Sequence, residues 1–134
     1  MRTWVNLLGY VLITLAMGAQ NDPKVSLPQP SPGVVQLAPG KLDFGIQPVG
    51  VASQSKSATL INTGKTRLTI SDISASGIDF TQKNTCPSVL AAGQECAITV
   101  VFKPAINEPR FGTVIISDSD PSGPHMLLLS GTGQ

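Results

Sequence analysis

The chain has few of the residues on which many binding and catalytic sites depend. Its 134 residues include one Trp, one Tyr, one His and four Phe. Trp4 and Tyr10 both lie in the first ten residues, so no Trp or Tyr follows that segment. A sugar-binding surface commonly uses such aromatic faces, and acid–base catalysis commonly uses histidine. The composition therefore argues against a carbohydrate-binding module and leaves His125 as the sole imidazole.

The chain also lacks an excess of charge of either sign. Nine Lys and Arg residues stand against eight Asp and Glu residues. Arg2 is the only charged residue before Asp22, so the rest of the chain is formally neutral. Proteins that bind nucleic acid or anionic lipid carry basic patches, and we expect neither partner here.

No hydrophobic run reaches the roughly 20 residues that cross a bilayer. The apolar run from Val5 to Met17 follows Arg2, and small residues surround Met17 at Ala16 and Gly18. This pattern predicts a signal peptide, residues 1–19, cleaved after Gly18 or Ala19. We expect an exported protein of the periplasm, cell surface or extracellular space, with no membrane span after signal removal. Retention of the leader as an anchor is the alternative.

Cysteine is scarce as well, with Cys86 and Cys96 alone. Two cysteines in an exported chain predict one disulfide, which would close a short loop and stabilise the fold by roughly 2–3 kcal/mol. Together with one histidine they cannot complete a tetrahedral zinc site. We therefore predict no cofactor and no metal centre built on these cysteines.

Proline is abundant before the domain. Five prolines lie in residues 20–39, which predicts an extended linker, although Val34–Leu37 could form an edge strand. From residue 40 to 134 the chain consists of short β-type runs with turn signals between them, such as Asn62–Lys65.

The segment Thr85–Pro104 has the clearest strand pattern. Side chains of a strand alternate between its faces, so Cys96, Ile98, Val100 and Phe102 share one face. About seven such strands predict an all-β, immunoglobulin-like antiparallel sandwich. The expected core residues share the inward parity of their strands and are Phe44, Leu60, Leu68, Ile70, Phe80, Leu90, Ile98, Val100, Phe102, Val114, Ile116, Leu127 and Leu129.

Several motifs in order resemble a known family. They are LDFGIQPVG at Leu42–Gly50, INTGKTRLTI at Ile61–Ile70, the C-x9-C stretch with AITVVFKP, and LSGTG at Leu129–Gly133. They resemble the Hydin-like (ASH) domains, whose bacterial members are often labelled choice-of-anchor D domains. The resemblance covers about residues 40–133. It implies an immunoglobulin-like, seven-stranded sandwich related to the major sperm protein group, with a binding or structural role and no catalysis.

Three small motifs could carry chemistry. A catalytic triad would need Ser, His and an acid brought together, and no G-x-S-x-G elbow surrounds a serine. Asp118-Ser119-Asp120 could offer carboxylates to calcium, and His125 with Met126 could bind copper. Pro121 and Gly123 follow the aspartates, as in a hairpin turn. We therefore expect a turn here and no catalytic residues.

One surface deviates from ordinary sheet patterning. On the last two expected strands, the side that faces away from the core carries Phe111, Ile115, Met126 and Leu128. A solvated sheet face should be polar, and a contiguous exposed apolar patch marks a partner surface. We expect this face to dock a protein. The alternatives are that Val34–Leu37 folds back over it, or that the strand register differs by one residue.

Together these features predict a non-catalytic, exported binding or assembly module of the bacterial cell envelope. It would engage a protein partner through a sheet face or an edge strand. The alternative function is an accessory domain that binds an extracellular glycan or a metal ion.

Overall fold

The structure is a computed structural model that describes residues 34–134. The expected leader and residues 20–33 of the expected linker lie outside the described residues. Residues 34–134 form strands and turns and contain no helix, so no helix among them could cross a membrane.

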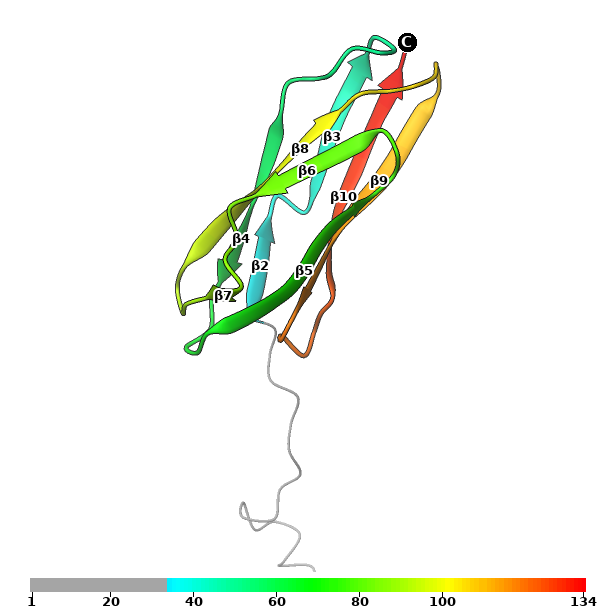
Figure 1. Cartoon of the computed structure of the whole chain (residues 1–134). Coiled ribbons are helices and arrows are strands. Elements are labelled where there is room, and N and C mark those ends of the chain that lie inside the picture. Colours follow the sequence, from blue (N-terminus) through cyan, green and yellow to red (C-terminus); the bar gives the residue numbers. More distant parts are fainter. Residues whose placement is uncertain (1–33) are drawn as a thin grey trace, which may run out of the picture. The chain divides into compact units, whose positions relative to one another are not determined.

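Nine strands in the described part of the chain form two sheets (Figure 1). The five-stranded sheet has the order β3 (Lys41–Gln47), β10 (His125–Gly133), β9 (Pro109–Asp118), β5 (Leu68–Ser76) and β7 (Val89–Leu90). The four-stranded sheet has the order β2 (Val35–Ala38), β4 (Lys56–Asn62), β8 (Glu95–Phe102) and β6 (Phe80–Asn84). The expected all-β, immunoglobulin-like sandwich is confirmed, with two short strands, β2 and β7, beyond the seven expected.

Pairing is antiparallel throughout except between β3 and β10, which run parallel. The exception arises where the chain changes sheets. β2 pairs with β4, and after the two residues Pro39 and Gly40 the chain continues as β3 beside β10. Proline has no N–H to donate to a neighbouring strand, so Pro39 fits the position where the chain leaves one sheet for the other. The Val34–Leu37 run thus contributes an edge strand of the four-stranded sheet.

The core lies between the sheets and follows side-chain alternation. On β8 every second residue from Cys96 to Phe102 is buried. The expected core residues are all buried except Phe44, which is half-buried and packs against the others. Three further buried residues complete the core: Leu42, Ala58 and Cys96.

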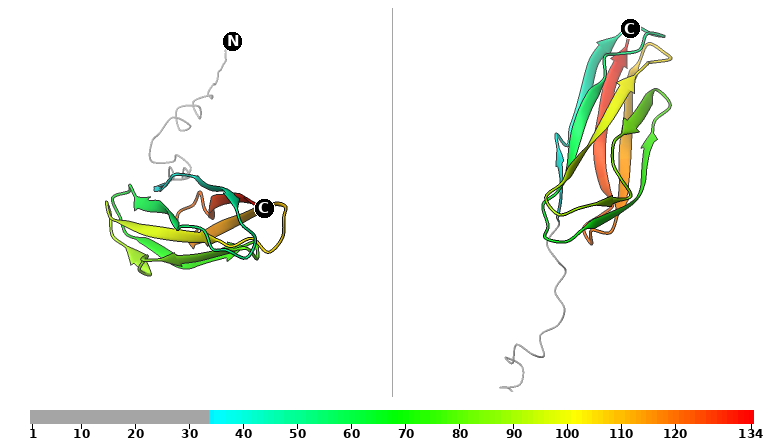
Figure 2. Two further views of the ribbon diagram at one scale, coloured as in Figure 1. Left: turned by 90° about the horizontal axis from the view of Figure 1, so that it is seen from above. Right: turned by 60° about the vertical axis from the view of Figure 1, so that its left-hand side comes forward.

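Phe102 is fully buried at the centre of an aromatic cluster. Its ring stacks on Phe80 at a centroid distance of 4.8 Å and meets Phe44 at 5.8 Å. On the opposing strand, Gly131 leaves room for this ring, because a Cβ atom at Gly131 would lie 2.4 Å from Phe102 Cε2. The C-terminal end of β10 continues beside the β8–β9 connection (Figure 2), where Gly133 N–H donates to the Glu108 carbonyl at 3.0 Å.

Two local features hold the connections. Cys86 and Cys96 form the expected disulfide, which ties the segment after β6 to the start of β8. The expected Asn62 turn is organised by a fully buried amide: Asn62 Nδ2 donates to the Thr66 and Leu90 carbonyls, and its Oδ1 accepts from Gly64 N–H. A buried polar side chain with all of these partners stabilises the turn at little desolvation cost.

Replacing Gly131 should destabilise the protein. The added methyl of Gly131→Ala meets the buried Phe102 ring, so we expect the free energy of unfolding to fall by about 1–3 kcal/mol. Gly40→Ala is the matched control because no atom lies within 4 Å of its Cβ position; it should leave stability unchanged or raise it by up to about 1 kcal/mol. Urea unfolding of both variants checks this. Equal stabilities would show that the cluster adjusts freely.

Candidate functional site

The outer face of the five-stranded sheet carries the expected apolar residues. β9 and β10 pair with Met126 opposite Ile115 and with Phe111 opposite Ser130. Phe111 is 74% exposed, Met126 56% and Leu128 52%, whereas Ile115 is half-buried. We call these four residues the partner face. The register predicted for these strands is correct, because Val114, Ile116, Leu127 and Leu129 point into the core.

The structure exposes one further apolar residue on β3 of the same sheet. Strict alternation from Leu42 and Phe44 would place Ile46 inward, yet Ile46 is 68% exposed and lies opposite Thr132. A register shift between β3 and β10 at Gly45, whose φ is 64°, reverses the alternation. Glycine adopts this left-handed conformation without steric cost, so Gly45 is the sequence signal that could have revealed the bulge.

The partner face also contains a shallow depression of about 310 Å³. Side chains or backbone from three adjacent strands line it: Lys41, Phe111, Gly112, Leu128, Leu129 and Ser130. An apolar floor with one cation at its rim fits a protein surface better than a small polar ligand.

The described part of the N-terminal segment does not cover the partner face. β2 pairs with β4 in the other sheet, with Val35 opposite Asn62 and Ala38 opposite Thr59. The alternative in which Val34–Leu37 folds over this face is therefore wrong.

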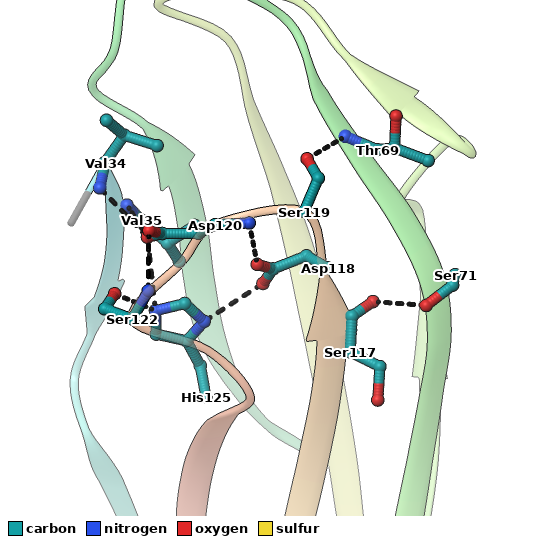
Figure 3. A network of polar contacts seen from close by, with 10 residues as sticks. All are labelled: Val34, Val35, Thr69, Ser71, Ser117, Asp118, Ser119, Asp120, Ser122 and His125. Atoms are coloured by element: carbon teal, nitrogen blue, oxygen red, sulfur yellow. Dashed lines mark hydrogen bonds and ion pairs between the residues drawn. The ribbon is translucent and has the colours of Figure 1, made fainter. Parts of the chain in front are cut away.

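A second region of interest is the turn between β9 and β10, where Asp118, Asp120 and His125 converge (Figure 3). Both aspartate side chains are fully buried, and His125 is 17% exposed. His125 Nδ1 lies 3.0 Å from Asp118 Oδ2, and His125 Nε2 lies 3.5 Å from Asp120 Oδ2. We call these three side chains the turn network.

Asp120 joins the turn network to the first described strand. Its Oδ2 accepts from the N–H groups of Val34 at 2.9 Å and Val35 at 3.1 Å, and its Oδ1 accepts from Ser122 N–H at 3.1 Å. Burial raises the pKa of Asp120, but these hydrogen bonds to the carboxylate outweigh burial and hold the pKa below its ordinary value of 3.8.

The same turn brings together a serine, a histidine and an acid, which the sequence did not predict. Ser122 Oγ lies 3.3 Å from His125 Nε2, and His125 Nδ1 contacts Asp118. Acyl transfer also needs N–H donors for an oxyanion. In this turn Ser122 N–H and Gly123 N–H both donate to Asp120, and Pro124 has no N–H. The turn therefore lacks free donors beside the serine.

The turn network also offers three ligands for a metal ion, two carboxylates and one imidazole, with donor atoms within 4.8 Å of one another. Their hydrogen bonds compete with coordination. Asp120 Oδ2 already accepts two backbone hydrogen bonds, and Asp118 Oδ1 accepts Asp120 N–H at 2.8 Å. A metal would have to displace these internal partners, so the geometry favours the hairpin turn over the calcium and copper alternatives.

A glycan site has little aromatic support in residues 34–134. Phe44, Phe80 and Phe102 pack together in the core, which leaves Phe111 as the one exposed ring of the described part. A second depression, of about 320 Å³, lies between β5 and the disulfide loop and is lined by Asp72, Asn84 and several serine or apolar residues. No aromatic side chain lines it.

Comparisons with known proteins agree with this architecture. A family model described as HYDIN/CFA65/VesB-like, Ig-like domain matches residues 33–131. No curated protein matches the sequence.

Solved structures share the fold at low sequence identity. A Porphyromonas gingivalis protein of unknown function has a TM-score of 0.64 and 17% identity, over 84% of this chain and 51% of its own. The ASH/PapD-like domain 7 of human CEP192 has a TM-score of 0.62 and 14% identity, over 82% of this chain and 93% of its own. The VesB protease of Vibrio cholerae has a TM-score of 0.59 and 20% identity, over 74% of this chain and 32% of its own. The chain thus spans about half of the first of these relatives and a third of the last.

Removing the Asp120 charge should weaken the protein at neutral pH. Asp120→Asn leaves a backbone N–H of Val34, Val35 or Ser122 poorly paired, so the free energy of unfolding should fall by about 1–3 kcal/mol at pH 7. The folded-state pKa of Asp120 is lowered. The stabilisation that its charged carboxylate provides is therefore complete above pH 3.8 and is lost as the pH falls through the folded-state pKa.

Urea unfolding from pH 7 to pH 3 measures this effect. The stability difference between wild type and Asp120→Asn should narrow at the acid end. Asp72→Asn, at an exposed carboxylate on β5, is the control and should change stability little at any pH. A difference that is constant with pH would contradict a role for the Asp120 charge.

Proposed function

Because the chain belongs to the HYDIN/CFA65/VesB-like family of Ig-like domains, we propose that it is a non-catalytic, exported binding or assembly module of the bacterial cell envelope. It docks a protein partner on the partner face of the five-stranded sheet. The observation that carries this proposal is the exposure of Phe111, Met126 and Leu128 on two adjacent strands. Solvated sheet faces are ordinarily polar, and exposed apolar clusters mark interaction sites.

The surroundings of these residues fit a protein interface. The apolar centre is flanked by Lys41 on β3 and by hydroxyl side chains such as Thr113 and Ser130, which lie opposite or beside it. Interfaces commonly place aromatic and Met side chains at the centre and polar groups at the rim. Phe111 and Met126 are residue types of that kind.

A non-catalytic role is supported by the turn network. Ser122 lies within reach of His125 of this network, but the N–H groups of Ser122 and Gly123 are used within the turn. An accessory role beside other domains or proteins is also in keeping with the VesB protease, of which this fold is about a third.

Charges placed on the partner face should abolish partner capture. We expect the domain to capture a protein in a crosslinked pull-down from the native cell envelope. The double variant Met126→Glu, Leu128→Glu should capture at least tenfold less of that protein, because it places two carboxylates in an apolar contact. The matched control is Gln36→Glu, Thr81→Glu, which adds the same charge at exposed positions of the four-stranded sheet.

Circular dichroism and melting temperature establish that both double variants fold. Equal capture by wild type and by the partner-face variant would refute docking at this face.

Export is supported by the disulfide between Cys86 and Cys96, since such bonds persist in oxidising compartments. The intact mass of the native protein, measured without reductant, should be two hydrogens lighter than the mass after reduction. The native N-terminus should begin after Gly18 or Ala19. Free thiols in the native protein would remove the main argument for export.

A further inference from the structure

β2 is held in the sandwich in a different way from the other described strands. Each of those contributes at least one buried residue to the core, whereas β2 contributes none. Val35 and Leu37 are half-buried and pack against the core, and Gln36 and Ala38 are exposed. β2 therefore covers the core without forming part of its interior.

The polar contacts of β2 come mainly from its backbone. It pairs with β4 from Asn62 to Thr59, and the Val34 carbonyl accepts from Thr63 N–H at 2.7 Å. At its start, the buried Asp120 carboxylate accepts two successive N–H groups. We call the space bounded by β4 and Asp120 the strand slot. Any extended segment with apolar residues at alternate positions could make these contacts.

Two other stretches of strand without a neighbour carry features that oppose strand addition. On β3, Lys56 Nζ donates to the Asp43 carbonyl and a bulge lies at Gly45. β7 pairs with β5 only at Leu68 and Thr69, and beyond them Gln82 Nε2 donates to the Ile73 carbonyl of β5. Bulges and side chains that bond to edge carbonyls block pairing with a further strand. The strand slot instead presents a buried carboxylate aimed at backbone N–H groups.

The chain is anchored again directly after β2. The Gly40 carbonyl accepts from Leu128 N–H at 3.1 Å, and Leu42 is buried. The connection between β2 and β3 consists of Pro39 and Gly40. Residues 34–38 can therefore leave the sheet while β3 and the core residues stay in place, and short connections of this kind favour exchange of an element between copies.

We propose that the strand slot is a binding site for an extended segment, and that the β2 segment of a second copy of this chain fills it in exchange for the chain's own. A second copy fits the strand slot because its identical Val-Gln-Leu segment can make the same contacts with β4 and Asp120 of the partner. The product is a strand-exchanged dimer. This site is separate from the partner face, so either proposal can fail alone.

Single-cysteine variants test the exchange directly. Ala38 and Thr59 are Cα partners in the β2–β4 ladder. When full chains carrying Ala38→Cys and Thr59→Cys are mixed and mildly oxidised, a disulfide-linked heterodimer should form and should increase with protein concentration. Ser57 and Thr99 are partners between β4 and β8, so an equal mixture of Ser57→Cys and Thr99→Cys is the matched control. We expect at least fivefold less heterodimer in the control.

Heterodimer at the control level in the Ala38→Cys and Thr59→Cys mixture would overturn the proposal. Hydrogen exchange of the wild-type chain gives an independent measurement. Backbone amides of β2 should exchange at least tenfold faster than those of Ile98 and Val100 on β8, because β2 opens without global unfolding. Equal protection of β2 and β8 would show that β2 is not released, and would also overturn the proposal.

Discussion

The constraint on which this structure depends is that each strand must bury one of its faces between two sheets. One close approach is that of the Phe102 ring, which stacks on Phe80 and lies against the bare backbone of Gly131. That packing sets how closely β10 approaches β8 across the sandwich. The remaining core residues follow from the same alternation on neighbouring strands.

Once the inner faces are committed to the core, the outer faces are free to differ. The five-stranded sheet exposes Phe111, Met126 and Leu128, although burial inside the sandwich does not require apolar residues there. The cost of exposing such side chains to water is offset when a partner covers them. In the proposed function the outer face binds the partner, whereas the core stabilises the fold.

Polar interactions are concentrated where the chain joins and leaves the sheets. Asn62 and Asp120 are both buried, and both accept or donate to backbone groups of connections. Asp120 links the β9–β10 turn to Val34, which precedes it by 86 residues. This long-range contact ties the start of the first described strand to the β9–β10 turn.

Sequence alone determined the features that depend on neighbouring residues. Alternation on Glu95–Phe102 predicted the buried face of β8, two lone cysteines predicted their disulfide, and four ordered motifs predicted the Hydin-like family that the matched residues confirm. The tertiary structure decided the parallel pairing of β3 with β10, the outward turn of Ile46 and the meeting of Ser122, Asp118 and His125. These three features depend on a change of sheet, a bulge and the fold of one turn. Residue alternation carries no information about which separate segments come into contact.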